Sequence, residues 1–196
     1  MLTIAILAGG MSQRMGRDKA FLPFLGQPLI CRVMDRMTAL AGELLIVAPQ
    51  TDEYLALGVR LVPDLLPGRG SLGGLYTALA SASHPLVAVI PCDAPFVSPT
   101  LIAHEHDLLV SNDLDAVVPS SSSGLEPLHA VYRRDPCMSV VRDALDAGER
   151  RAIGWYARAR VRILTPDEIA GFDPDLVFLN VNTPEEFTLA EQLAAK

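Results

Sequence analysis

The sequence predicts an α/β protein whose helices cover both faces of a mainly parallel sheet. Two observations favour this class: short apolar runs without polar alternation recur along the chain, and amphipathic stretches separate them. Parallel strands need crossover connections, and a helix in each crossover packs against the sheet. Because ligands of such sheets bind beyond the carboxyl ends of the strands, functional side chains are expected there.

The apolar runs are the predicted strands. Each is bounded by glycine, proline or polar residues, and each is short for a helix. They cover residues 2–7, 44–48, 86–90, 116–118 and 177–179. The serine-rich stretch 120–124 is expected to join neighbouring strands.

The segments between the strands are the predicted helices. They cover residues 28–40, 72–81, 99–109, 136–147 and 184–194. Ser98 precedes a proline, which is typical of a helix start with a capping hydroxyl. The segments 165–168 and 183–186 read Thr-Pro-Asp-Glu and Thr-Pro-Glu-Glu, which is the spacing of a capping box.

Size and composition predict one globular domain over residues 1–196. Hydrophobic residues make up 50% of the chain and charged residues 20%, which is typical of a packed protein. The formal net charge of −7 argues against a general nucleic-acid binder. The 3 cysteines form no CxxC pair, which favours a reducing cytoplasm. The apolar start of the chain is too short for a membrane span and lacks a basic leader, so neither a membrane protein nor a signal peptide is expected.

The segment 7–19 leaves the first predicted strand and indicates a phosphate-binding loop. Gly9 and Gly10 allow the backbone to approach a ligand closely, so that N–H groups can face phosphate oxygens. Arg14 and Lys19 add positive charge. The spacing matches neither the P-loop pattern GxxxxGK[ST] nor the dinucleotide turn GxGxxG. An ordinary glycine turn with solvated cations is the alternative.

Carboxylate and amide side chains follow two other predicted strands. Asp93 comes after the strand 86–90 and is placed to bind Mg²⁺, a hard cation that prefers oxygen ligands and phosphate. The alternative is a loop aspartate that caps nearby N–H groups. Asn180 and Asn182 would point to the same side of a strand, where their oxygens would face a metal or a phosphate. Asn182 is alternatively part of the following helix start.

A second glycine-rich turn, 67–74, follows Asp64 and opens a predicted helix. Helix N-termini favour anions, so this turn with Gly70 is a second candidate for nucleotide contact, or else a flexible connection. His129 lies in another candidate segment, and we expect a satisfied strand histidine there rather than a substrate ligand.

Together these segments resemble the molybdenum cofactor guanylyltransferases, within the nucleotidyltransferase superfamily that activates sugars and cofactors. The family pattern LAGGxSxRMGxDKA is matched without a gap by residues 7–20. Further similar segments are Cys-Asp-Ala-Pro-Phe at 92–96, Glu-Pro-Leu-His at 126–129, Gly-Glu-Arg-Arg at 148–151 and Asn-Val-Asn-Thr-Pro-Glu-Glu at 180–186. The likeness runs nearly the full length of the chain.

The resemblance implies a Rossmann-like three-layer sandwich of the nucleotide-diphospho-sugar transferase type, with a mostly parallel mixed sheet. It implies transfer of GMP from GTP to molybdopterin carrying molybdenum, with release of pyrophosphate and with Mg²⁺ as cofactor. Proteins that deliver and receive the cofactor are implied partners. The enzyme is expected to be a monomer or a weak oligomer.

Roles for single positions follow from the resemblance together with the phosphate-binding chemistry above. The expected catalytic residues are Arg14, Lys19 and Asp93, with Asp93 as the Mg²⁺ ligand. The expected nucleotide-binding residues are Leu7, Ala8, Gly9, Gly10, Lys19, Asp64, Gly70, Asp93, Asn180 and Asn182.

The chain departs from the family in two places. Gly-Ser-Leu-Gly-Gly at 70–74 replaces the usual Gly-Pro-Leu-Ala-Gly, and Pro49 replaces a more polar residue. Both changes bear on base selectivity rather than on catalysis. A cytidylyltransferase for the same cofactor and a sugar-phosphate nucleotidyltransferase are therefore alternatives. A non-catalytic nucleotide-binding protein is a third alternative, although such a protein would be expected to lack Lys19 or Asp93.

Overall fold

The structure is a computed structural model, and it describes residues 1–8 and 18–195. The strands are β1 (Leu2–Leu7), β2 (Pro23–Phe24), β3 (Gln27–Pro28), β4 (Glu43–Val47), β5 (Arg60–Val62), β6 (Leu86–Pro91), β7 (Ala116–Ser121), β8 (Gly124–Leu125), β9 (Ala130–Arg133) and β10 (Val161–Leu164). The α-helices are α1 (Leu29–Met37), α2 (Asp52–Leu55), α3 (Gly70–Ser81), α4 (Pro99–Ser111), α5 (Arg134–Asp146), α6 (Pro174–Val177) and α7 (Pro184–Ala194). The 3-10 helices are η1 (Lys19–Phe21), η2 (Thr38–Leu40), η3 (Tyr156–Arg158) and η4 (Ala170–Phe172).

The central sheet has the strand order β10-β7-β9-β6-β1-β4-β5, and β8 pairs with the end of β7. Strands β6, β1, β4 and β5 are parallel to one another, and β10 is parallel to β7. Strand β9 runs antiparallel to β6 and β7, because the hairpin with β8 and the turn at 126–129 reverse the chain over a short distance. The predicted mostly parallel mixed sheet is confirmed.

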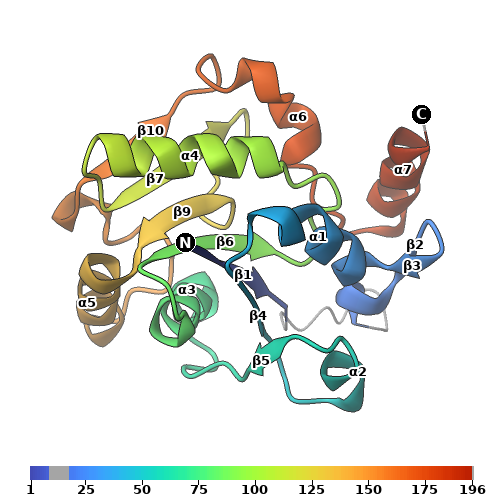
Figure 1. The fold of residues 1–196 in the computed structure, drawn as a ribbon, viewed down its shortest axis with the longest axis horizontal. Helices are drawn as coiled ribbons and strands as arrows, with labels where there is room; N and C mark the ends of the chain where they lie inside the picture. The colour runs from blue at the N-terminus through green and yellow to red at the C-terminus, as the bar shows by residue number, and fades with distance from the viewer. Residues whose placement is uncertain (9–17, 196) are drawn as a thin grey trace.

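Helices cover both faces of the sheet, so the molecule has three layers with the sheet in the middle (Figure 1). Alternation along β1 sends Ile4 and Ile6 to the face of α1 and α4, where they join a buried cluster with Ile30 and Leu101. Ala5 points the other way, into a second cluster with buried residues of α3 and α5. Burial on both faces explains why the strands appear in the sequence as continuous apolar runs.

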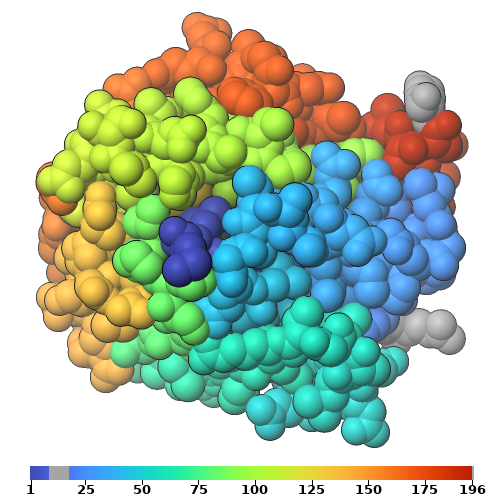
Figure 2. All heavy atoms as spheres, viewed as in Figure 1, coloured from blue at the N-terminus to red at the C-terminus, as the bar shows by residue number. Residues whose placement is uncertain are grey.

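On the side of the molecule that Figure 2 shows, helices cover most of the sheet. Met1 lies at the surface and is 86% exposed. Helix α7 lies beside the β2–β3 hairpin (Figure 1). There Ala190 joins a cluster with Phe24, and the backbone N–H of Leu25 donates to Glu191 Oε1 at 3.0 Å. These contacts attach helix α7, near the end of the chain, to the β2–β3 hairpin near its start.

The predicted helix starts form, with one exception. Ser98 Oγ accepts from the N–H of Leu101 at 3.2 Å, and the segment 183–186 makes a complete capping box. The segment 165–168 makes the hydrogen bonds of a capping box but opens into turns and the short η4 instead of a longer helix. A glycine and a proline follow within the next residues, and neither favours helix growth.

The predicted strand at 177–179 is wrong. Val177 ends the short helix α6, and the chain then runs without regular structure to α7. The run is apolar because Val177 and Phe178 pack into the cluster on the α4 face, and a buried run of this length looks the same in either structure. The prediction also lacked β5 and β10, which are short and partly exposed, and it gave no strand bounds for β9.

Among residues 1–8 and 18–195, none of the helices combines the length and the apolar composition that a membrane crossing needs.

Candidate active site

A cavity of about 1090 Å³ opens where β1, β4 and β6 end. Backbone pairing continues past these ends, since the N–H of Ala8 donates to Val47 O at 2.8 Å and that of Cys92 to Leu7 O at 3.0 Å. The cavity therefore lies at the edge of the sheet where ligands were expected. The predicted site residues that line it are Leu7, Ala8, Lys19, Asp64, Gly70, Asp93, Asn180 and Asn182.

Lys19 links two sides of this cavity. Its Nζ donates to Asp93 Oδ2 at 2.6 Å and to Asn182 Oδ1 at 2.7 Å. The side chains of Lys19 and Asp93 are 17% and 16% exposed, so a ligand in the cavity can still reach both. The ammonium is placed for phosphate oxygens, and the carboxylate is placed for a cation that displaces the ammonium.

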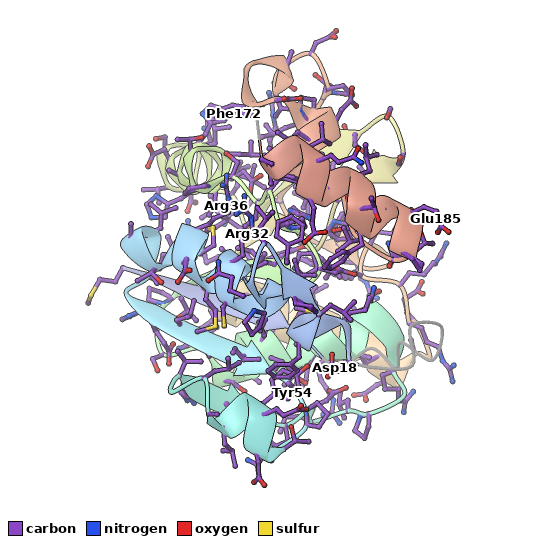
Figure 3. All side chains as sticks on the ribbon, turned by 90° about the vertical axis from the view of Figure 1, so that its right-hand side faces the viewer. Asp18, Arg32, Arg36, Tyr54, Phe172 and Glu185 are labelled. Carbon is purple, nitrogen blue, oxygen red and sulfur yellow. The ribbon has the colours of Figure 1, made fainter. Side chains whose placement is uncertain are left out.

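Asp18 fixes the short helix that carries Lys19. Its Oδ1 accepts from the N–H of Ala20 at 3.0 Å and caps η1, and its Oδ2 accepts from Tyr54 Oη at 2.7 Å. Figure 3 shows Tyr54 beside Asp18. Burial, reinforced by Asp18, raises the pKa of the Tyr54 phenol far above its ordinary value, so the hydroxyl remains a donor. The prediction omitted Asp18 as a positioning residue, although an aspartate before a helical turn is the usual capping signal.

Helix α1 holds the loop that carries Asp93. Arg32 Nε donates to Pro95 O at 3.0 Å, and Arg36 Nε donates to Val97 O at 2.7 Å. Both arginines extend from α1 (Figure 3). The loop after β6 therefore has a fixed backbone, which holds the carboxylate of Asp93 at the cavity.

Asn180 and Asn182 line the same cavity, but not because of the strand alternation from which their common side was predicted. No strand forms at these positions. Instead the N–H of Val181 donates to Asp93 O at 3.0 Å, and the N–H of Asn182 donates to Glu186 Oε2 at 2.7 Å. These bonds place both amides at the cavity. Asn182 is thus part of the start of α7 and a neighbour of Lys19 at the same time.

Asp64 lines the cavity beyond the end of β5. Its Oδ1 accepts from the N–H of Leu66 at 3.0 Å and from Thr77 Oγ1 at 2.9 Å, which ties the loop to α3. Gly70 starts α3 with a φ of +65°, a conformation that favours glycine. The N-terminus of α3 therefore reaches the cavity, where it favours an anion.

Part of the departure from the family pattern has a packing explanation. A Cβ on Gly73 would lie 2.8 Å from Arg69 Cβ and 3.0 Å from Leu66 O, so this chain has no room for an alanine. Ser71 lines the cavity, and its Oγ accepts from the N–H of Ala152 at 3.2 Å. Gly73 thus reflects local packing, and Ser71 is the changed residue of this turn that a ligand can meet.

The opposite wall of the cavity is the turn 126–129, which precedes β9. His129 is 2% exposed, and its ring meets the ring of Phe178 edge-on with centroids 5.1 Å apart. Burial lowers the pKa of His129 to about 4 against an opposing effect of Asn180, so the ring is neutral at pH 7. The expectation of a satisfied strand histidine is wrong, because His129 lies in the turn and neither ring nitrogen has a hydrogen-bond partner among the described residues.

Gly9, Gly10 and Arg14 lie outside the described residues. In the part of the chain that the structure describes, no group of 3 or more His, Cys, Asp or Glu side chains is arranged to hold a metal ion. A cation at Asp93 would therefore depend on ligands other than a cluster of protein carboxylates.

A cavity across the carboxyl ends of parallel strands, with a lysine and a carboxylate paired inside it, defines an α/β protein that can bind a phosphorylated ligand. Comparison with known proteins leads to a particular family. The sequence pattern of the "MobA-like NTP transferase domain" matches residues 4–161. The chain belongs to this family, that of the molybdenum cofactor guanylyltransferases.

Full-length relatives and a solved structure are similar to the chain. The probable molybdenum cofactor guanylyltransferase of Pelotomaculum thermopropionicum is 34% identical over 98% of this chain and 93% of its own. The molybdenum cofactor guanylyltransferase of Desulfosudis oleivorans is 37% identical over 97% and 94%. The molybdopterin-guanine dinucleotide biosynthesis protein A of Archaeoglobus fulgidus superposes with a TM-score of 0.83 at 26% identity, over 98% of both chains.

Proposed function

We propose that this protein transfers GMP from GTP to molybdopterin that carries molybdenum, with release of pyrophosphate. The observation that carries the proposal is the Lys19 ammonium, which lies between Asp93 and Asn182 in a cavity at the sheet edge. The names of the full-length relatives support guanylyl as the transferred group and the molybdenum cofactor as the acceptor.

The strand order divides the cavity into two halves. One half is formed by the ends of β1 and β4, the loop after β5 and the start of α3, and we call it the nucleotide half because we propose that GTP binds there. The other half is formed by the turn 126–129 and Asn180, and we call it the acceptor half. Lys19 and Asp93 lie between the halves, because β6 separates β1 from β9 in the sheet. We assign GTP to the nucleotide half, where the N-terminus of α3 favours an anion.

In the proposed reaction, a phosphate oxygen of the acceptor forms a bond to the α-phosphorus of GTP. The bond from this phosphorus to the bridging oxygen of pyrophosphate breaks. A phosphate monoester is largely ionised at neutral pH, so the acceptor needs no strong general base. The Lys19 ammonium would leave Asp93 and bind the phosphates, where it would neutralise the charge that develops on the leaving oxygens. Arg14 is proposed to assist on the strength of the sequence pattern alone.

Mg²⁺ is the proposed cofactor, with Asp93 as its protein ligand. The donors at the site are suited to it, since a reachable carboxylate lies beside the Asn182 amide oxygen, and Asn180 Oδ1 is buried without a partner among the described residues. Mg²⁺ binds commonly through one or two carboxylates together with substrate phosphates, and it keeps several waters. When bound, the cation would stabilise negative charge on the phosphoryl oxygens.

Incubation with each nucleoside triphosphate, Mg²⁺ and molybdopterin, followed by measurement of pyrophosphate, tests this function. We expect turnover with GTP. Turnover with CTP alone would overturn the guanylyl assignment in favour of a cytidylyltransferase. Turnover only with a sugar phosphate as acceptor would point to a sugar-phosphate nucleotidyltransferase, and nucleotide binding without pyrophosphate release to a non-catalytic protein.

We further propose that the enzyme acts in the cytoplasm as a monomer or weak oligomer, between a protein that delivers molybdopterin and one that receives the product. The free thiols of Cys31, Cys92 and Cys137 support a reducing compartment. Size-exclusion chromatography with light scattering tests the oligomeric state, and a stable dimer at micromolar concentration would contradict it.

A further inference from the structure

The acceptor half of the cavity contains a carboxylate that the proposed phosphate chemistry does not use. Glu126 lines this half, in the turn before β9. We propose that the Glu126 carboxylate binds the N–H edge of the acceptor's heterocycle and so selects a 2-amino-4-oxo ring. The inference rests on the proposed function, because it takes the acceptor to be a phosphorylated pterin.

Glu126 is held in a fixed orientation. Its Oε1 accepts from Ser121 Oγ at 2.7 Å, and its N–H donates to Pro119 O at 2.9 Å. The next carbonyl in the turn, that of Pro127, accepts from Tyr132 Oη at 2.6 Å. Among the described residues, Oε2 of Glu126 has no hydrogen-bond partner. A fixed carboxylate with free acceptor capacity on the wall of a cavity is prepared for a ligand that donates.

The charges that line the cavity decide which end of the acceptor substrate can bind at Glu126. The carboxylate repels a phosphate, whereas Lys19, in contact with Asp93, attracts one. The acceptor's phosphate must also lie near Lys19 for the transfer step. Its other end therefore points into the acceptor half, towards Glu126.

The surroundings of Glu126 suit a neutral, flat ring. Its neighbours on this wall are Pro127 and Leu128, which are apolar, and His129, which burial keeps neutral. The side-chain partner of Glu126 is Ser121, and among the described residues no cationic side chain forms an ion pair with this carboxylate. A pterin offers an amino group and an adjacent ring N–H on one edge, and two such donors match the two oxygens of a carboxylate.

A comparison of two ligands that differ at this edge tests the assignment. 6-Hydroxymethylpterin phosphate carries the 2-amino group, and the corresponding lumazine phosphate carries oxygen in its place. Their dissociation constants are measured by calorimetry with the wild-type protein, Glu126→Gln and Glu53→Gln. Glutamine keeps the shape of the side chain and can still accept from Ser121. Glu53 is exposed at the start of α2, so Glu53→Gln controls for the lost charge.

We expect the wild-type protein and Glu53→Gln to bind the pterin about 10- to 100-fold more tightly than the lumazine. In Glu126→Gln this preference should fall to about threefold or less, while GTP affinity stays within about twofold. Equal weakening of both ligands in Glu126→Gln, or no preference in the wild-type protein, would overturn the assignment. Ligand discrimination without guanylyl transfer would leave the assignment standing and refute the proposed function, so the two failures are distinguishable.

Discussion

At the scale of single residues, Lys19 and Asp93 form a contact that the proposed function would rearrange. Their side chains are 17% and 16% exposed, and both line the cavity. In the proposed reaction the ammonium is needed at the phosphates and the carboxylate at a cation, so each would leave the other when substrate binds. Until the ligand arrives, the ion pair keeps both charges in place.

Replacement of this ammonium tests its role. Lys19→Ala should lower turnover about 10²- to 10³-fold, the usual cost of removing one preorganised electrostatic donor. The measurement is GMP transfer at saturating GTP and Mg²⁺, with thermal unfolding as the check on the fold. Arg142→Ala is the matched control, since Arg142 is 50% exposed on α5, forms an ion pair with Asp146 and does not line the cavity. An unchanged rate in Lys19→Ala would remove the assigned role.

Glu105, on α4, illustrates how one buried group can carry a pH dependence. Its carboxyl is fully buried, and neither oxygen has a hydrogen-bond partner among the described residues. Burial raises its pKa well above the ordinary value of 4.5, so the folded protein holds this proton to a higher pH than the unfolded chain does. In the unfolded chain the group ionises near that ordinary value. The stability that the proton contributes is therefore present below pH 4.5 and is lost as the pH rises towards the folded-state pKa.

Glu105→Met should raise the free energy of unfolding by about 1–3 kcal/mol at pH 7, because it removes a buried polar group without a partner. The gain should shrink at pH 4, where the unfolded carboxyl is also protonated. Urea unfolding at the two pH values measures both effects. Glu105→Gln, which cannot ionise but stays polar, should lose the pH dependence with little gain. A gain in Glu105→Met that does not vary with pH would contradict the raised pKa.

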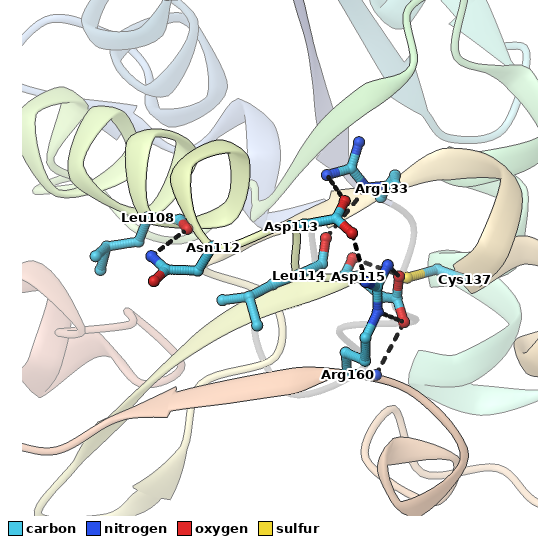
Figure 4. A network of polar contacts seen from close by, with 8 residues as sticks. All are labelled: Leu108, Asn112, Asp113, Leu114, Asp115, Arg133, Cys137 and Arg160. Carbon is cyan, nitrogen blue, oxygen red and sulfur yellow. Dashed lines mark hydrogen bonds and ion pairs between the residues drawn. The ribbon is translucent and has the colours of Figure 1, made fainter.

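At the scale of elements, a network of ion pairs joins β10, β7 and β9 at the ends of β7 and β10 away from the cavity (Figure 4). Asp115 Oδ1 accepts from Arg160 Nη2 at 2.8 Å, and its Oδ2 accepts from the N–H of Arg160 at 2.9 Å. Its carbonyl accepts from the N–H of Arg133 at 2.7 Å and from Cys137 Sγ at 3.1 Å. Asp113 forms a further, exposed ion pair with Arg160, whose Nη1 lies 2.6 Å from Asp113 Oδ2. The network fastens the edge strand β10 to the sheet.

Asp115→Ala should lower the free energy of unfolding by about 1–3 kcal/mol at pH 7, because it leaves a backbone N–H without its acceptor. Hydrogen bonds from Arg160 lower the pKa of Asp115, so this contribution is present above the ordinary value of 3.8 and is lost as the pH falls below it. Urea titration measures the loss, and hydrogen exchange should show faster opening of β10. Asp113→Ala is the control with the smaller effect. Equal losses of unfolding free energy in the two variants would contradict a larger contribution from the buried Asp115 carboxylate.

At the scale of the whole molecule, the cavity draws on segments from both ends of the chain. Leu7 and Lys19 lie near its start, Asn180 and Asn182 near its end, and Asp93 contacts both groups through Lys19 and Val181. A ligand bound there therefore holds together parts of the molecule that are distant in sequence. Its binding should appear as increased global stability.

GTP with Mg²⁺ should raise the free energy of unfolding by about 2.7 kcal/mol at a ligand concentration 100 times the dissociation constant. Removal of the metal with EDTA in the presence of GTP should abolish most of this gain, because Asp93 then keeps its pair with Lys19. Thermal unfolding with GTP, with Mg²⁺ and with both measures the coupling. Asp93→Asn should lose the metal dependence. Equal stabilisation by GTP with and without Mg²⁺ would contradict a metal ligand at Asp93.

Much of the fold could be predicted because local pattern and tertiary burial agree. The runs 2–7 and 86–90 are continuous in the sequence because they cross the middle of the sheet, where both faces are covered. The same signal failed at 177–179, where the run packs against the α4 face without pairing. It also missed β5 and β10, because edge strands bury less and carry weaker patterns.

The sequence by itself determined which charged groups of the site follow strands. Lys19, after the first strand, and Asp93, after a central strand, follow from residue types at strand ends, which meet at one edge of a parallel sheet. Only the tertiary structure decided what completes the cavity. The bond from Val181 to Asp93 brings in the asparagines, and the antiparallel return into β9 brings in Glu126. These contacts join residues far apart in the chain, and local spacing carries no information about such pairs.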